Sequence, residues 1–198
     1  MSFHIMMGSE MSSQVDDFKE FIKQNSARDT FRRYILHADC QMIESGQSFA
    51  LKSKICDKLN VEFDNVIVVG SCKLGFSIKP TKRFVPFGDE SDIDVAIVSP
   101  TLFESVWRTA LEYKYSNADW QSQRQFFNYL SSGWIRPDKF PRGENFAFST
   151  DWFEFFREMT NSREYGDYKI AAGIYYNSFF LEKYQETCLE QCILEVNQ

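Results

Sequence analysis

The fold of this chain is decided by two stretches, Val66-Ile-Val-Val-Gly-Ser-Cys-Lys-Leu-Gly75 and Ser91-Asp-Ile-Asp-Val-Ala-Ile-Val98. Each contains a run of β-forming apolar residues, which predicts two strands that lie largely in the core. Side chains alternate between the faces of a strand, so Asp92 and Asp94 lie on the same face, roughly 6–7 Å apart along the second strand. Two carboxylates at this spacing can share a pair of divalent cations.

The first apolar run ends at Gly70-Ser71, a small turn rich in hydrogen-bond donors where a chain of phosphates can bind. We expect residues 71–77 to begin a helix whose first N–H groups and dipole favour an anion. A surface hairpin with two solvated aspartates is the alternative interpretation. It does not explain why charges enter an otherwise apolar strand, because a buried carboxylate is costly unless it is paired or bound to metal.

A Gly-Ser turn followed by an Asp-x-Asp strand resembles the signature of the polymerase-β-like nucleotidyltransferase superfamily. The matching positions are Gly70, Ser71, Asp92 and Asp94, and the resemblance covers residues 64–100. It implies that the two aspartates are catalytic and hold Mg2+ (or Mn2+), and that the Gly-Ser turn binds the β- and γ-phosphates of a nucleoside triphosphate. The implied reaction transfers a nucleoside monophosphate to an acceptor and releases pyrophosphate.

The resemblance also implies a third catalytic, metal-binding carboxylate on a strand that follows the helix after the Asp-x-Asp strand. Asp138 stands at about the right place in the chain, although Pro137 favours an edge strand or a bulge there. Asp151 is the rival, but it directly precedes a predicted aromatic helix, where aspartate is a good N-cap. Glu144 is a third alternative. We assign the third ligand to Asp138 and keep open that this acid is missing.

Basic side chains cluster in or near the loop that joins the two predicted strands. They are Lys73, Lys79, Lys82 and Arg83. Lys73 lies two residues after the Gly-Ser turn, so we expect it to contact the triphosphate as a point charge. For Lys79 or Lys82 singly we prefer a solvated loop position. Lys169 opens the last segment and can reach a triphosphate from the far side of a cleft, unless it is simply an exposed lysine at a helix start.

Aromatic residues make up 17% of the chain and crowd its second half. Phenylalanines at helical spacing, such as Phe153 and Phe156, are expected in the core. Tyr175 and Tyr176 can instead flank a nucleobase, since aromatic side chains stack on bases.

The predicted fold class is α/β (α+β), a small mixed polymerase-β-like sheet flanked by helices. We expect residues 1–13 to be a flexible lead without periodicity and residues 14–62 to form helices. Residues 63–150 form the nucleotidyltransferase core in this interpretation. Residues 151–198 are expected to be mostly helical and packed on that core.

The composition is that of an ordinary globular protein of 198 residues, with 43% hydrophobic and 25% charged residues. No long apolar stretch predicts a membrane span, and the first residues lack the basic flank of a secretory signal. The five cysteines include no Cys-x-x-Cys pair, which favours reduced thiols in the cytoplasm over a zinc site. A net charge of −6 argues against non-specific binding to duplex nucleic acid.

The Phe-Gly-Asp-Glu-Ser-Asp-Ile-Asp run (87–94), with the later Gly-Trp-Ile-Arg-Pro-Asp stretch (133–138), resembles stand-alone bacterial nucleotidyltransferases, some of them encoded in anti-phage defence loci. This resemblance implies a nucleotide or oligonucleotide signal that governs a separately encoded effector. Two alternatives are an enzyme that nucleotidylates a small molecule or a protein partner, as an antitoxin does with its toxin, and a catalytically silent nucleotide-binding module.

Overall fold

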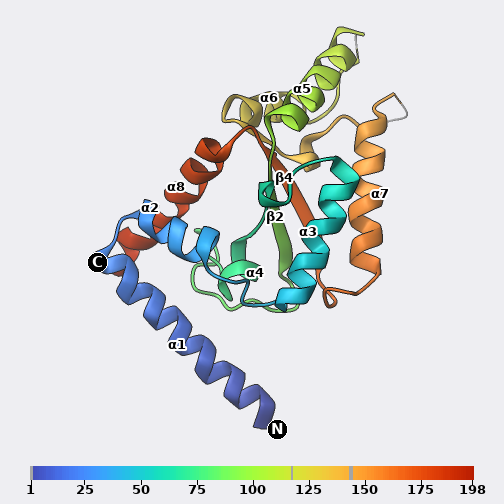
Figure 1. The fold of residues 1–198 in the computed structure, drawn as a ribbon. Helices are drawn as coiled ribbons and strands as arrows, with labels where there is room; N and C mark the ends of the chain where they lie inside the picture. The colour runs from blue at the N-terminus through green and yellow to red at the C-terminus, as the bar shows by residue number, and fades with distance from the viewer. Residues whose placement is uncertain (1, 117, 143–144) are drawn as a thin grey trace.

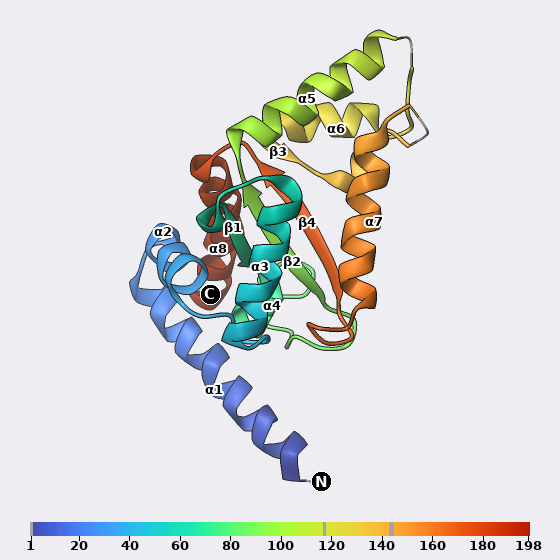
Figure 2. The same cartoon turned by 45° about the vertical axis from the view of Figure 1, so that its right-hand side comes forward.

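The strands of this protein form one mixed sheet with helices on both faces (Figure 1, Figure 2). The structure is a computed structural model that describes residues 2–116, 118–142 and 145–198, with side chains described from residue 13 onward. In these ranges the sheet has the order β1-β2-β4-β3. Strand β2 pairs antiparallel with β1 and parallel with β4, and the short edge strand β3 pairs antiparallel with β4. The strands are β1 (Val66–Val69), β2 (Asp92–Val98), β3 (Trp134–Ile135) and β4 (Lys169–Tyr175).

Helices make up most of the remaining chain. None of those in the described residues is both long and apolar enough to cross a membrane. They are α1 (Ser2–Gln24), α2 (Ala27–Thr30), the π-helical η1 (Phe31–His37), α3 (Ser45–Leu59), α4 (Gly70–Leu74), α5 (Pro100–Tyr115), α6 (Gln123–Ser131), α7 (Ala147–Asn161) and α8 (Ser178–Val196), with short 3-10 turns η2 (Phe63–Asn65) and η3 (Pro137–Lys139).

Alternation along the strands divides the buried residues into two cores. The first core contains Ile93, Val95 and Ile97 of β2 and is covered by α3, α5, α6 and α7. The second core contains Ala96 and Val98 of β2 and is covered by α1, α2, η1 and α8. Asp92 and Asp94 belong to the same face as Ala96 and Val98, at the beginning of β2. Their carboxylates therefore lie where the second core ends.

Local sequence explains where the long helices begin. The Oγ of Ser99 accepts a hydrogen bond from the N–H of Leu102 at 3.2 Å, and Pro100 takes the first position of α5. Asn177 caps α8 in the same way, because its Oδ1 accepts from the N–H of Phe179 at 3.1 Å. These caps set the two helices that leave the ends of β2 and β4.

The predicted α+β class, with a small mixed sheet flanked by helices, and the two motif strands are confirmed, but three predicted segments differ. Helix α1 begins at Ser2, whereas residues 1–13 were expected to be a lead without periodicity; Met1 lies outside the described residues. Within residues 14–62, where the sequence predicts helices, η1 ends at His37 and residues 38–44 form a loop before α3. Residues 169–175, expected to be mostly helical, form strand β4 in the interior of the sheet. The two alanines and the glycine of β4 carry little strand signal, so its pairing with β2 and β3 decides its conformation.

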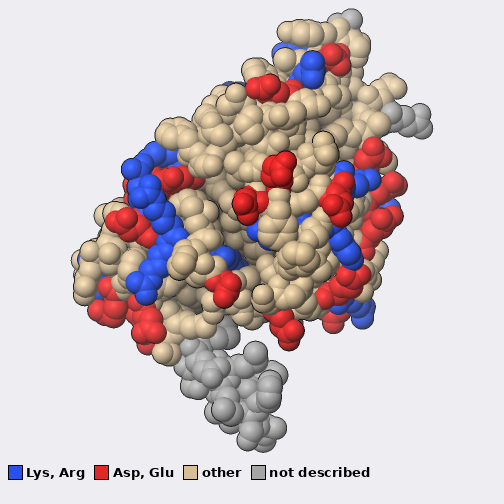
Figure 3. Space-filling view, viewed as in Figure 1, with Lys and Arg blue, Asp and Glu red and all other residues tan. Residues whose placement is uncertain are grey.

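Charged side chains are spread over the surface. On the face shown in Figure 3, acidic and basic side chains are interspersed. Several oppositely charged side chains of the described residues form ion pairs. Arg28 of α2, for example, lies 2.7 Å from Glu182 and 3.1 Å from Glu186 of α8. These pairs join the N-terminal helices to the last helix.

Candidate functional site

Asp92 and Asp94 are the first and third residues of β2. Their carboxylates lie on the same sheet face as the second core, beyond the part of that face that the core covers. Their side chains are 41% and 28% exposed. Asp94 is paired in register with Val69, the last residue of β1. The end of β1 therefore brings the residue that follows it directly against Asp94.

That residue is Gly70, whose backbone conformation and surroundings disfavour a side chain. Its φ is +70°, a conformation that L side chains rarely adopt. A Cβ added there would lie 2.8 Å from Oδ2 of Asp94. Ser71 follows in α4, which has only five residues and ends at Leu74, with Gly75 as its C-cap, rather than continuing to Ser77 as expected. The Gly-Ser turn and the Asp-x-Asp strand thus meet at one point.

Each aspartate faces a lysine. Nζ of Lys79 lies 3.4 Å from Oδ2 of Asp94, and Nζ of Lys169 lies 3.7 Å from Oδ2 of Asp92. Both lysines are more than half exposed, so these ion pairs are weak and can open. Lys79 comes from the loop between α4 and β2, in which the N–H of Ser77 donates to the carbonyl of Val85 at 2.9 Å.

Burial raises the pKa of Asp94, and the charge of Asp92 raises it further, whereas Lys79 lowers it. A desolvated carboxylate beside a second one is stabilised by a cation. The lysines supply part of that charge in this structure, and a divalent ion would supply more.

A cavity of about 770 Å3 opens at this point. Gly70, Ser71, Lys79 and Lys169 line it together with the two aspartates, and α7 and α8 contribute other walls. This volume lies in the range of small-molecule sites, and apolar walls with a few converging charges are typical of them.

Asp138 lines the same cavity but is engaged with basic neighbours. It lies in η3, after the edge strand β3, and not on a strand. Its carboxylate accepts two hydrogen bonds from Arg136, at 3.0 and 3.1 Å, and pairs with Lys139 at 3.1 Å. Burial raises the pKa of Asp138, but the hydrogen bonds and charges of the two basic residues outweigh it and lower the pKa overall. Within the described ranges, no group of three or more His, Cys, Asp or Glu side chains is arranged to hold a metal ion.

Strand β4, which lies beside β2, carries no acid on the aspartate face. Lys169 is opposite Asp92, and Ala171 is opposite Asp94. Asp151 is exposed within α7, which already begins at Ala147, so it is neither an N-cap nor part of the cavity lining. The remaining alternative, residue 144, lies outside the described residues.

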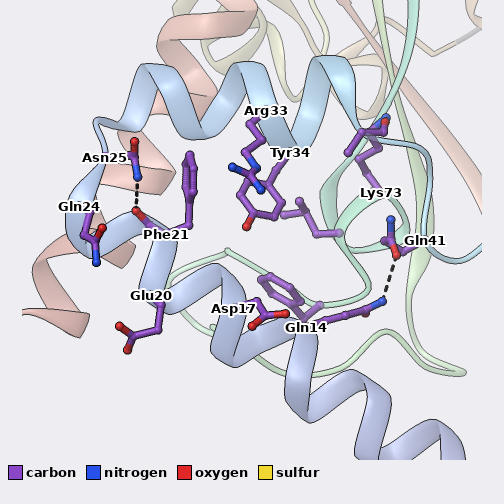
Figure 4. A pocket seen from close by; sticks show the side chains of 13 residues that line it. Gln14, Asp17, Glu20, Phe21, Gln24, Asn25, Arg33, Tyr34, Gln41 and Lys73 are labelled. Atoms are coloured by element: carbon purple, nitrogen blue, oxygen red, sulfur yellow. Dashed lines mark hydrogen bonds between the residues drawn. The ribbon is translucent and has the colours of Figure 1, made fainter.

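Lys73 points away from the aspartates. It is buried, and its Nζ donates a hydrogen bond to the carbonyl of Ala38. It lines a different pocket of about 510 Å3, between α1 and η1, together with Arg33 and Tyr34 (Figure 4). Helix α4 therefore lines both cavities. Gly70 and Ser71 line the large one, and Lys73 lines the smaller one. Lys73 is not among the residues that line the cavity with Asp92 and Asp94, and its contact with a triphosphate stays a prediction.

Of the two tyrosines considered for base binding, Tyr175 lines the large cavity and Tyr176 does not. Tyr175 is buried and stacks on Trp134 at 5.5 Å between ring centroids, with both residues lining the large cavity. The hydroxyl of Tyr176 donates to Glu104, at 3.1 Å, outside this lining. Arg136, which sequence reasoning did not select, lines the cavity as well, with its guanidinium 5.2 Å from the centre of the Trp134 ring. The sequence feature that could have identified Arg136 is its position two residues before Asp138.

No family model, curated protein or solved structure matches this chain. The assignment of a function therefore rests on the residues and geometry of the site itself.

Proposed function

We propose that this chain is a metal-dependent, template-independent nucleotidyltransferase. It transfers a nucleoside or deoxynucleoside monophosphate from the triphosphate to an acceptor and releases pyrophosphate. The observation that carries the proposal is the close approach of Gly70 to the carboxylate of Asp94, at the mouth of a cavity that Asp92 and Ser71 also line. A small donor-rich turn close to one of two neighbouring carboxylates suits a metal-bound triphosphate.

The donor set fits Mg2+ or Mn2+. Magnesium in phosphoryl-transfer sites takes one or two carboxylates, keeps several waters and binds substrate phosphates. Asp92 and Asp94 offer the carboxylates, and burial leaves Asp94 in need of a cation. When bound, the ion would neutralise the triphosphate and the departing pyrophosphate.

Residues around the two aspartates would bind the phosphates and position the nucleotide. The hydroxyl of Ser71 and the backbone beside it would bind phosphate oxygens. A bound ion would replace the lysines as the partner of the aspartates. Lys79 and Lys169 would then be free to bind the phosphates. The cavity walls would hold the nucleotide in line with its acceptor and exclude water, which is how such sites accelerate phosphoryl transfer.

The product in this proposal is a nucleotide or oligonucleotide signal that acts on a separately encoded effector. Transfer of a nucleotide to a protein partner, such as a toxin, or to a small molecule uses the same machinery with a different acceptor. Identification of the product separates these outcomes.

One observation favours a second candidate function, a catalytically silent nucleotide-binding module. The strand beside β2 offers Lys169 and Ala171 where a third acid would complete the ligand set, and Asp138 is paired with Arg136 and Lys139. A site with two acids would bind a metal-nucleotide complex yet hold a second ion weakly.

The deciding experiment measures pyrophosphate release from each ribo- and deoxynucleoside triphosphate with Mg2+ or Mn2+, with products identified by mass spectrometry. We expect turnover by the wild type, loss of at least 100-fold in Asp92→Asn/Asp94→Asn, and a larger loss in Asp138→Ala than in Asp151→Ala. Asp151→Ala is the matched control, because this exposed acid lies outside the cavity lining. Calorimetry of nucleotide binding accompanies each assay.

Turnover retained by the double variant would place the reaction elsewhere. Binding without turnover in the wild type, lost in the double variant, would establish the silent module. Neither binding nor turnover in the wild type would overturn both candidates.

A further inference from the structure

A pair of free cysteines lies directly behind the Gly-Ser turn. The sulfurs of Cys40 and Cys72 are 3.6 Å apart, although the residues are 32 positions apart in the chain. Cys40 belongs to the loop between η1 and α3, and Cys72 is the third residue of α4. The contact therefore joins a connecting loop to the short helix that begins with Gly70 and Ser71.

Further contacts hold this loop against α4 and keep the sulfurs facing each other. Sγ of Cys40 lies 3.1 Å from the carbonyl oxygen of Cys72. The N–H of Gln41 donates to the carbonyl of Lys73 at 3.1 Å, and the amine of Lys73 donates to the carbonyl of Ala38. The loop is thus hydrogen-bonded to α4 at Ala38, before Cys40, and at Gln41, after it.

We propose that Cys40 and Cys72 are an oxidisable thiol pair, which a peroxide converts into an intramolecular disulfide that ties this loop to α4. The thiolate of Cys40 attacks one oxygen of hydrogen peroxide, the O–O bond breaks, and hydroxide leaves to become water. Sulfur of Cys72 then attacks the sulfenic sulfur of Cys40, loses its proton, and expels the sulfenic oxygen as a second water. Two thiols are oxidised by two electrons, and one peroxide is reduced.

The surroundings assign different roles to the two thiols. Cys40 is partly exposed, whereas Cys72 is fully buried, so peroxide reaches Cys40 first. The hydrogen bond with Cys72 lowers the pKa of Cys40, with the nearby Lys73 adding a smaller effect. The same hydrogen bond and burial raise the pKa of Cys72. Cys40 is therefore the thiol that peroxide oxidises first, and the buried Cys72 is the thiol that resolves the sulfenic acid.

We expect disulfide formation to shift the turn of the candidate active site, because Cys72 belongs to the same five-residue helix as Gly70 and Ser71. An S–S bond is about 2.05 Å long, so the sulfurs must approach by about 1.5 Å from their 3.6 Å separation. Cys72 directly follows Ser71, and on the other side of that serine a Cβ on Gly70 would lie only 2.8 Å from Oδ2 of Asp94. We expect oxidation to weaken nucleotide binding at least tenfold, a consequence that rests on the function proposed above.

The first test concerns the disulfide alone. The full chain is treated with hydrogen peroxide, then unfolded and alkylated, and analysed by intact mass and peptide mapping with and without reductant. We expect two of the five thiols to escape alkylation, a reducible link between the Cys40 and Cys72 peptides, and no link in Cys40→Ser or Cys72→Ser. Cys56→Ser is the matched control and should behave as the wild type.

Several results would overturn the proposal that Cys40 and Cys72 form a disulfide. They are five alkylated thiols after oxidation, a link that maps to Cys188 and Cys192 or joins two chains, and sulfinic acid at Cys40 in the wild type. If Cys72→Ser does not fold, Cys40→Ser, at the partly exposed position, decides the question.

The second test measures nucleotide binding by the reduced and oxidised forms of the wild type and of Cys40→Ser. We expect the loss on oxidation in the wild type alone. A disulfide that forms without any change in affinity would reject the coupling to the turn. Absence of binding in the reduced wild type would reject the proposed function instead, and the mapping result would stand by itself.

Discussion

At the residue scale, Gly70 decides the geometry of the site more than any charged group does. Its φ is positive, and a Cβ at this position would lie 2.8 Å from Oδ2 of Asp94, so the Asp94 carboxylate would have to shift to admit a side chain. We expect Gly70→Ala to lower the free energy of unfolding by about 1–3 kcal/mol, because an L residue is strained at this φ and crowds the carboxylate. Nucleotide affinity should fall with it.

Urea unfolding and calorimetry measure the two effects of Gly70→Ala. The control is Gly46→Ala in α3, where an added Cβ meets nothing within 4 Å. That change should leave binding intact and raise stability by up to about 1 kcal/mol, because alanine favours a helix. A Gly70→Ala protein as stable as the wild type and equally able to bind nucleotide would contradict the close contact.

At the scale of elements, β4 is the strand on which the sheet depends. Its Ile174 is fully buried and is paired with Ile97 of β2 on one side and Ile135 of β3 on the other. We expect Ile174→Ala to cost about 2–5 kcal/mol and Ile174→Val about 0.5–1.5 kcal/mol, because truncation leaves a cavity in the first core.

Chemical denaturation tests the two Ile174 variants against Leu194→Ala in α8. Leu194 is 64% exposed, so its change should stay within about 0.5 kcal/mol. A loss for Ile174→Ala as small as that of the control would mean that β4 does not lie inside the sheet.

At the scale of the whole molecule, the two cores share one sheet and should unfold together. Phe31 of η1 is nearly fully buried in the second core, whereas Trp152 of α7 lies in the first. We expect Phe31→Ala to cost about 3–5 kcal/mol. Far-UV circular dichroism and tryptophan fluorescence should report the same shifted transition, because neither core keeps its sheet face without the other. Helix loss at lower denaturant than the fluorescence change would show two independent units.

The sequence by itself determined the two motif strands, the fold class and the shared face of Asp92 and Asp94. These features depend on neighbours in the chain, because alternation along a strand follows from backbone geometry alone. The turn at Gly70 and Ser71 was predictable for the same reason, because a strand that ends at a Gly-Ser pair turns within a residue or two.

Only the tertiary structure decided which other groups meet those residues. It made residues 169–175 a strand beside β2, which put Lys169 opposite Asp92 and Ala171 opposite Asp94. It turned Lys73 toward Ala38 and brought Cys40 to Cys72. The physical reason is that sheet order and helix packing depend on contacts between residues far apart in the chain, which the local pattern of residues does not encode.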